Sequence, residues 1–213
     1  MTKNFAITLS EYDRIFRVVH SVSEGLDDRV GASCLFYNTI GALLIENSLK
    51  VKAWPVMGAA FFRVNDATDT VLSFSAFDEN DICISNPDAF HCWVETQDHV
   101  IDFTAPVYQK YFDKMGMGVK LPNKMFQKKK TTMSPSWREL YKEGDYFIQE
   151  DRPLTTSLRL KALETPAISD LANVCLYWFK RPPKKISESM SIMNDLGEVV
   201  EVNLATLPII GSW

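Results

Sequence analysis

The segment from Cys34 to Glu46 most constrains the fold, because it contains no proline and is apolar on almost every side. A helix that is apolar all round is buried in a core rather than lying on the surface. The remainder of the chain must therefore cover this helix from several sides. At 213 residues the chain is long enough to do so within one domain.

The start of this helix is marked by Gly31-Ala32-Ser33, with Ser33 as the predicted N-cap. Cys34 would then lie in the first turn, where unpaired backbone N–H groups and the helix dipole favour an anion. Such a position favours the reactive thiolate over the thiol. The backbone N–H of Cys34 is a candidate donor to an oxyanion. A buried cysteine that acts only as a small apolar side chain is the alternative interpretation.

Residues 89–103 are rich in strand formers on both sides of a short polar turn, which predicts a β-hairpin. A turn at Gln97-Asp98 makes Asp102 the diagonal neighbour of His91, whereas a turn at Thr96-Gln97 places these two residues directly opposite each other. Both registers keep His91 and Asp102 on one face of the hairpin. A carboxylate bound to one ring nitrogen fixes the tautomer and leaves the other nitrogen for a thiol. A polar, half-exposed hairpin face without catalytic function is the alternative.

Hydrophobic periodicity elsewhere predicts an α+β fold, in which a first amphipathic helix and the buried helix precede an antiparallel sheet. We expect a single domain over 1–213, with a core over about 9–112 and a C-terminal extension, 113–213, packed on it. The further expected elements are a helix from residue 8 that buries Tyr12, Ile15, Phe16 and Val19, strands at 51–57, 59–64, 71–77 and 146–149, a basic loop within 113–136, and helices at 136–142, 168–180 and 187–196.

A family resemblance rests on three stretches: Gly31-Ala32-Ser33-Cys34, His91-Cys92-Trp93-Val94-Glu95 and Val100-Ile101-Asp102-Phe103-Thr104. Together they resemble the transglutaminase-like branch of the papain-like cysteine-proteinase superfamily, and some small uncharacterised bacterial families share the pattern. The resemblance covers residues 31–104 and implies a papain-like fold. It implies that Cys34 is the nucleophile, His91 the general base and Asp102 the partner of His91. Trp93 is a candidate substrate-binding residue.

Two departures from the family pattern concern the oxyanion site. Papain-like proteases usually carry a Gln before the Cys, and many transglutaminases a Trp, but every Gln and Trp here follows Cys34. The second oxyanion donor is therefore unassigned. The stretch from Arg29 to Cys34, with Asn38 one helical turn further on, also resembles arylamine N-acetyltransferases, although the Arg is offset by one and one Gly of the usual pair is missing.

Charge and composition narrow the possible partners. The formal net charge is −4 and the pI about 5.4, which argues against a nucleic-acid partner. The N-terminus lacks the apolar core of a signal peptide, and the most apolar stretch, 53–62, is too short to span a membrane. The four cysteines form no CxxC pair, so we expect no metal site. We expect reduced thiols in a cytoplasm.

The function that these residues favour is thiol-dependent acyl transfer through Cys34, His91 and Asp102, with hydrolysis of an amide or peptide bond as the leading reaction. The expected substrate is a peptide or a small amide, and the chemistry needs no cofactor. Acyl transfer to an amine, and a non-catalytic binding module on the same fold, are the alternatives. The sequence leaves the oligomeric state open.

Overall fold

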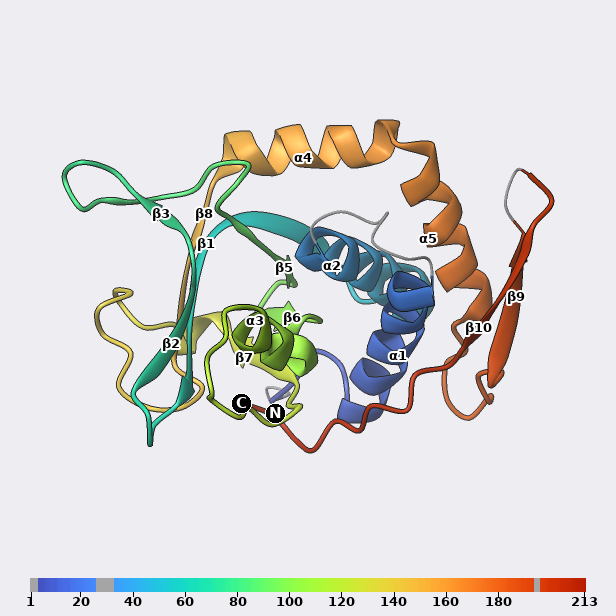
Figure 1. Ribbon diagram of the computed structural model, residues 1–213, viewed down its shortest axis with the longest axis horizontal. Helices are drawn as coiled ribbons and strands as arrows, with labels where there is room; N and C mark the ends of the chain where they lie inside the picture. The colour runs from blue at the N-terminus through green and yellow to red at the C-terminus, as the bar shows by residue number, and fades with distance from the viewer. Residues whose placement is uncertain (1–3, 26–32, 194–195) are drawn as a thin grey trace.

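The computed structural model describes residues 4–25, 33–193 and 196–213. Its helices and strands form a mixed α+β structure around one curled antiparallel sheet (Figure 1). The helices are α1 (Leu9–Gly25), α2 (Ser33–Leu44), the π-helical turn η2 (Ile45–Leu49), the 3₁₀ turns η3 (Ala105–Val107) and η4 (Lys130–Thr132), α3 (Tyr108–Lys114), α4 (Arg152–Glu164) and α5 (Pro166–Trp178). The strands are β1 (Trp54–Asn65), β2 (Thr70–Phe74), β3 (Ala76–Phe77), β4 (Cys83–Ile84), β5 (His91–Glu95), β6 (His99–Asp102), β7 (Phe126–Lys129), β8 (Tyr146–Glu150), β9 (Ser189–Met193) and β10 (Val199–Asn203).

The long strand β1 organises the main sheet, whose order is β2-β1-β5-β6-β7 with β8 also paired to β1. Gly58 of β1 pairs with both His91 and Glu150, so β5 and β8 lie on opposite edges of β1. A Cβ at Gly58 would lie 2.0 Å from the carbonyl oxygen of Gln149. Glycine therefore lets β8 approach β1 directly beside His91.

The apolar helix α2 is buried as predicted, between the sheet on one side and α1 and α5 on the other (Figure 1). The predicted buried face of α1 is also confirmed, since Tyr12, Ile15, Phe16 and Val19 are all 0% exposed. Gly41 lies against the ring of Phe103, which a Cβ there would approach to 2.2 Å. This close packing brings the helix that carries Cys34 against the end of the strand that carries Asp102.

The hairpin of β5 and β6 adopts the first of the two predicted registers. Val94 pairs with Ile101 and Glu95 with Val100, and the Thr96 N–H donates to the His99 carbonyl at 2.9 Å. The turn is therefore Gln97-Asp98. Asp102 is consequently the diagonal same-face neighbour of His91.

Several of the predicted elements differ from those in the structure. Phe126–Lys129, within the predicted basic loop, forms β7 and pairs with β6. Residues 136–142 form turns rather than a helix. Ser189–Met193, within a predicted helix, is β9, and residues 194–195 lie outside the described part of the chain. The predicted strand 71–77 is divided into β2 and β3. The predicted strands at 51–57 and 59–64 are one strand, β1, which begins at Trp54.

The helix α4 was not predicted, although its start carries clear signals. The Asp151 side chain accepts a hydrogen bond from the Leu154 N–H at 2.9 Å, which is an N-cap, and Pro153 occupies the first turn. The strand at 146–149 and the helix at 168–180 were predicted correctly as β8 and α5. Among the described residues, no helix is both long and apolar enough to cross a membrane.

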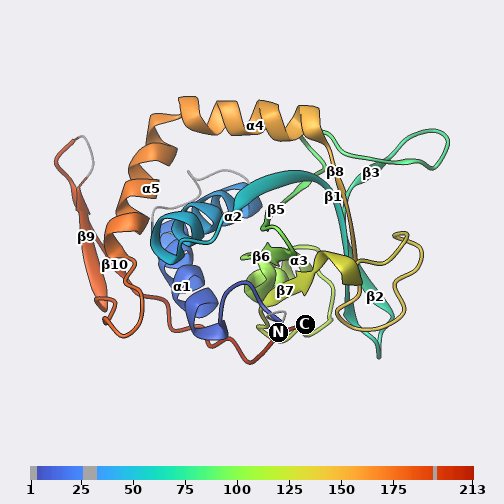
Figure 2. The same cartoon turned by 180° about the vertical axis from the view of Figure 1, so that it is seen from behind.

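Both ends of the described chain meet at β7 (Figure 2). The Gln127 side chain accepts from the N–H groups of Ala6 and Ile7 and donates to the Ile7 carbonyl. Met125 exchanges backbone hydrogen bonds with Gly211 and Trp213 near the other end. Because β7 and β8 also belong to the main sheet, the chain beyond residue 112 forms part of the sheet that carries His91.

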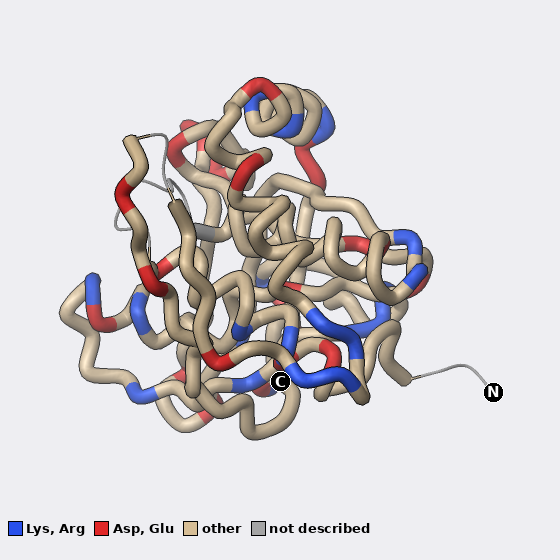
Figure 3. The backbone as a smooth tube through the Cα atoms, turned by 90° about the vertical axis from the view of Figure 1, so that its right-hand side faces the viewer, with Lys and Arg blue, Asp and Glu red and all other residues tan. Residues whose placement is uncertain are grey.

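Charged residues of both signs are interspersed on the side where β9 and β10 lie (Figure 3). Most ion pairs of the described residues have at least one solvent-exposed partner, such as Lys110 with Glu24 at 2.8 Å. Exposed pairs of this kind contribute little to stability. The fold therefore depends mainly on its apolar core and on the buried polar contacts described next.

Candidate active site

Cys34 lies in the first turn of α2, where the sequence predicted it. Its side chain is 7% exposed and packs with Met57, Cys92 and Leu154. Arg29, Gly31 and Ala32 lie outside the described residues, as does the side chain of Ser33, the predicted N-cap. The role of the Cys34 N–H as an oxyanion donor therefore stays a prediction.

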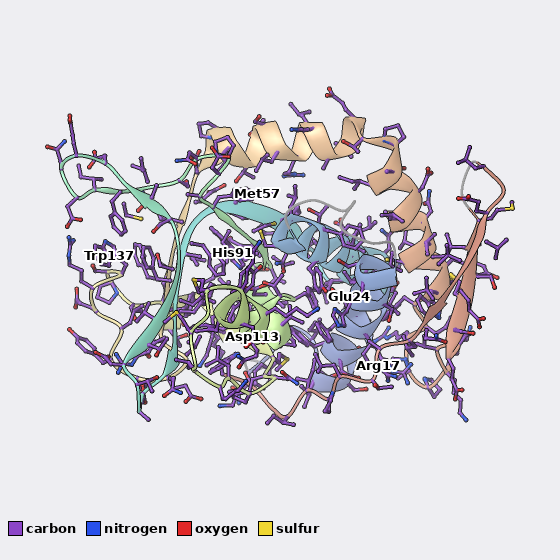
Figure 4. The ribbon with its side chains drawn as sticks, in the orientation of Figure 1. Arg17, Glu24, Met57, His91, Asp113 and Trp137 are labelled. Carbon is purple, nitrogen blue, oxygen red and sulfur yellow. The ribbon has the colours of Figure 1, made fainter. Side chains whose placement is uncertain are left out.

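His91 and Asp102 meet as the hairpin register requires. Their Nε2 and Oδ2 atoms are 2.6 Å apart, and both side chains are 0% exposed. The Phe74 ring stacks on the imidazole with ring centroids 4.2 Å apart, and Phe62 contacts it edge-on. In Figure 4, His91 lies just below Met57, on the strand next to β1. Two aromatic rings and one carboxylate thus fix the orientation of the imidazole.

The second ring nitrogen of His91, Nδ1, is buried and has no hydrogen-bond partner among the described residues. Cys34 nevertheless acts on this ring through its charge and its hydrogen-bonding capacity. Catalytic hydrogen bonds are often long or poorly aligned before substrate binds. The nitrogen that Asp102 leaves unoccupied is therefore the one that can exchange a proton with the thiol.

The groups around His91 raise the pKa of its imidazole. Burial on its own lowers the pKa of the imidazole, but the charge and hydrogen bond of Asp102, with a further contribution from Cys34, raise it to about 10. An imidazolium at neutral pH is consistent with this value. A positive ring beside a sulfur stabilises a thiolate.

Asp102 is held by five hydrogen-bond donors. Oδ2 accepts from His91 and from the Tyr108 hydroxyl at 2.6 Å. Oδ1 accepts from the Asn38 Nδ2 at 2.9 Å, the Thr104 N–H at 2.8 Å and the Thr104 hydroxyl at 2.6 Å. Burial acts to raise the pKa of this carboxyl, but His91 and the hydrogen bonds lower it below its ordinary value. Asp102 is therefore a carboxylate despite its complete burial.

Asn38 joins the three predicted residues and was not assigned to the site from its sequence position. Its Nδ2 donates to Asp102 Oδ1, to the Cys92 carbonyl at 2.7 Å and to the Cys34 carbonyl at 3.2 Å. Its Oδ1 accepts from the Phe103 N–H at 2.9 Å. One amide thus connects the helix of the thiol with both strands of the hairpin. The signal available in the sequence was its place one turn after Cys34, on the same side of a helix that is otherwise apolar.

Trp93, the candidate substrate-binding residue, lies elsewhere. Its side chain is 0% exposed within the apolar cluster inside the curled sheet, and its Nε1 donates to Glu95 at 3.2 Å. Trp93 is thus a core side chain that also lines a small pocket of about 210 Å³, and its role in substrate binding stays a prediction. The period-2 pattern of the strand placed Trp93 on the His91 face without indicating that this face is interior.

The other cysteines differ from Cys34 in their surroundings. All four are free thiols. Burial raises the pKa of Cys83, raises that of Cys92 well above its ordinary range, and raises that of Cys175 to about 12. Cys92 and Cys175 are completely buried and belong to the apolar core. Among the described residues, no cluster of His, Cys, Asp and Glu could hold a metal ion.

The His91–Asp102 pair predicts a pH dependence of stability. A pKa raised to about 10 in the folded state stabilises the fold fully below the unfolded value of about 6.5, and this contribution is lost as pH rises through 10. The lowered pKa of Asp102 acts in the opposite direction, and its contribution is lost as pH falls below about 4. Tyr12 and Tyr108, also in contact with Asp102, have pKa values raised well above 10 and do not titrate in this window.

We therefore expect the difference in unfolding free energy between the wild-type protein and His91→Asn to decrease from pH 6.5 to pH 10. Urea denaturation followed by circular dichroism at five pH values measures it. The matched control is His99→Asn, since His99 lies on the same hairpin and its ring is hydrogen-bonded to the Asn4 carbonyl rather than to a carboxylate. A constant difference for His91→Asn across this range contradicts the prediction.

Comparison with known proteins identifies the family. A family model described as "Protein of unknown function (DUF2026)" matches residues 8–213. A solved structure described as "The crystal structure of genomics APC5867" is 29% identical with a TM-score of 0.86, and the alignment covers 99% of this chain and 98% of that chain. Comparison with curated proteins gives no significant match. The match over nearly the whole chain means that this protein belongs to the DUF2026 family.

Proposed function

We propose that this protein is a thiol-dependent acyl-transfer enzyme in which Cys34 is the nucleophile, His91 the acid and base, and Asp102 the residue that orients and charges His91. The observation that carries the proposal is a buried imidazole that is bonded to Asp102 through Nε2, whose Nδ1 has no hydrogen-bond partner among the described residues and whose pKa Cys34 helps to raise. The order of helix, thiol and hairpin also supports a papain-like fold of the transglutaminase-like branch. A cytoplasmic location fits four free cysteines.

In the proposed reaction the Cys34 thiolate attacks the carbonyl carbon of an amide, and a C–S bond forms. The His91 imidazolium gives its Nδ1 proton to the leaving amine as the C–N bond breaks. The neutral imidazole then takes a proton from water, and the hydroxide attacks the thioester. The C–S bond breaks, the acid leaves, and the thiolate and imidazolium are restored. Asp102 keeps its charge throughout and stabilises the imidazolium.

There are two alternatives to hydrolysis. One shares the first half of this reaction, and the other involves no reaction at Cys34. In acyl transfer, an amine replaces water in the second half. In a non-catalytic module, the thiol never forms a thioester. A buried nitrogen without a hydrogen-bond partner, such as His91 Nδ1, destabilises the fold. A purely structural role for His91 and Asp102 gives no reason to keep such an atom. That unpaired atom favours the enzyme over the binding module.

A panel of acyl donors separates these functions. We expect thioesters and activated amides to add an acyl mass to Cys34, detected on the intact protein and located by peptide mass spectrometry. Cys34→Ala removes the adduct, whereas Cys83→Ala, the matched control at another buried free thiol, retains it. Clearance of the adduct in water identifies a hydrolase, and clearance only with an added primary amine identifies a transferase. Absence of any adduct with every donor contradicts the proposal.

A further inference from the structure

A cavity of about 460 Å³ adjoins the candidate site, between the start of α2 and the hairpin formed by α4 and α5. In Figure 1 these two helices pass over and beside α2. The cavity lies within the size range of small-molecule binding pockets. Its apolar wall is formed by Leu35, Phe36, Phe90, Leu158, Ile168 and Leu171.

The cavity lies beside the side chains that pack around the thiol, and Cys34 itself is not among the residues that line it. Leu35, Phe90 and Leu158 line it and also pack against the cluster that contains Cys34. Leu35 directly follows Cys34 in the chain, and Phe90 directly precedes His91. An acyl group attached to the Cys34 sulfur therefore has an apolar space next to it.

The polarity of the cavity indicates what it can hold. Its two charged lining residues, Asp88 and Lys161, are both exposed, so they lie at the mouth rather than on the wall. A charged group in the interior would lose its hydration without an ionic partner. An apolar group would gain free energy in proportion to the surface it buries.

The cavity also extends away from the thiol. Thr39, Ala162 and Ile168 line both this cavity and a neighbouring groove of about 590 Å³ between α2 and α5. The two spaces are therefore separated only by shared side chains. This arrangement suits an elongated group rather than a compact one.

We propose that this cavity, which we call the acyl pocket, binds an apolar alkyl or aryl acyl group of the substrate whose carbonyl carbon Cys34 attacks. The proposal rests on the proposed function and specifies its substrate class. It predicts that acylation of Cys34 depends on the length and polarity of the acyl chain. Leu158, which touches both the Cys34 cluster and the pocket, determines this preference.

The test uses p-nitrophenyl acetate and p-nitrophenyl octanoate as probes. We measure the rate at which each acylates Cys34 in the whole protein, by release of nitrophenol and by intact mass. We expect the octanoate to react at least about tenfold faster than the acetate, and Leu158→Gln to lower this ratio about tenfold. Leu160→Gln is the matched control, because Leu160 lies on the same helix, is 55% exposed and does not line the cavity.

The outcomes distinguish this inference from the function on which it rests. Acylation of Cys34 by both esters at similar rates overturns the acyl pocket and leaves the nucleophile in place. Failure of both esters to acylate Cys34 overturns the two together. If Leu158→Gln does not fold, the ratio of the octanoate to the acetate acylation rate in the wild-type protein still tests the acyl pocket. A second measure is whether octanoate, but not acetate, protects Cys34 from iodoacetamide.

Discussion

We expect acylation of Cys34 to slow by about 10²- to 10⁴-fold in Asp102→Asn, by analogy with the loss that the same change causes in a serine triad. The amide oxygen of the new side chain takes the place of Oδ1, where three donors converge. Its NH₂ group then faces His91 Nε2 and the Tyr108 hydroxyl, which both donated to the carboxylate. His91 must accept there and carry its proton on Nδ1, so it can no longer take a proton on the side of the thiol.

The same substitution lowers stability as well as reactivity. Loss of the buried charge pair and reorientation of two donors cost about 1–3 kcal/mol, the range for a disturbed buried hydrogen bond. The fold persists, because the surrounding apolar clusters are unchanged. Asp98→Asn is the matched control, since Asp98 is exposed in the turn of the same hairpin. Stopped-flow acylation rates and urea denaturation measure both effects, and wild-type acylation in a folded Asp102→Asn protein contradicts the role of Asp102.

The parts of the fold that could be predicted are those with strong periodicity or a local turn signal. The all-apolar pattern of α2 required burial, and the buried face of α1 followed from its 3.6-residue spacing. Polar residues in one short turn defined the hairpin. Its two possible registers both kept His91 and Asp102 together, so this contact did not depend on choosing between them.

The errors arose where tertiary contacts override local preference. The stretch at Phe126–Lys129 carries three polar residues, and its strand exists because it pairs with β6 and because Gln127 binds the backbone of residues 6 and 7. Ser189–Met193 is a strand because it pairs with β10. Neither partner is visible from the local sequence.

The candidate site was only partly predictable for a similar reason. Cys34, His91 and Asp102 each carry recognisable chemistry. Asn38, Thr104 and Tyr108 are ordinary polar residues, and only their convergence on one buried carboxylate shows their role. Convergence of this kind depends on the packing of α2 against the hairpin, which residue spacing alone does not give.

The pH dependence of Cys34 alkylation tests most directly whether His91 activates Cys34. We propose that the imidazolium of His91 stabilises the Cys34 thiolate in the wild-type protein. In His91→Asn that charge is lost, and an ordinary thiol, whose pKa is about 8.5, is almost entirely protonated at pH 6. At pH 6 the wild-type protein should therefore react about 100-fold faster at Cys34 than the variant does.

The measurement is the iodoacetamide labelling rate of each cysteine in the folded protein from pH 5 to pH 9, read by peptide mass spectrometry. We predict that Cys34 labels first, that His91→Asn slows its labelling at pH 6, and that His99→Asn changes neither the order nor the rate. Equal Cys34 rates in the wild-type protein and a folded His91→Asn variant, or earlier labelling of Cys83, Cys92 or Cys175, would contradict this prediction.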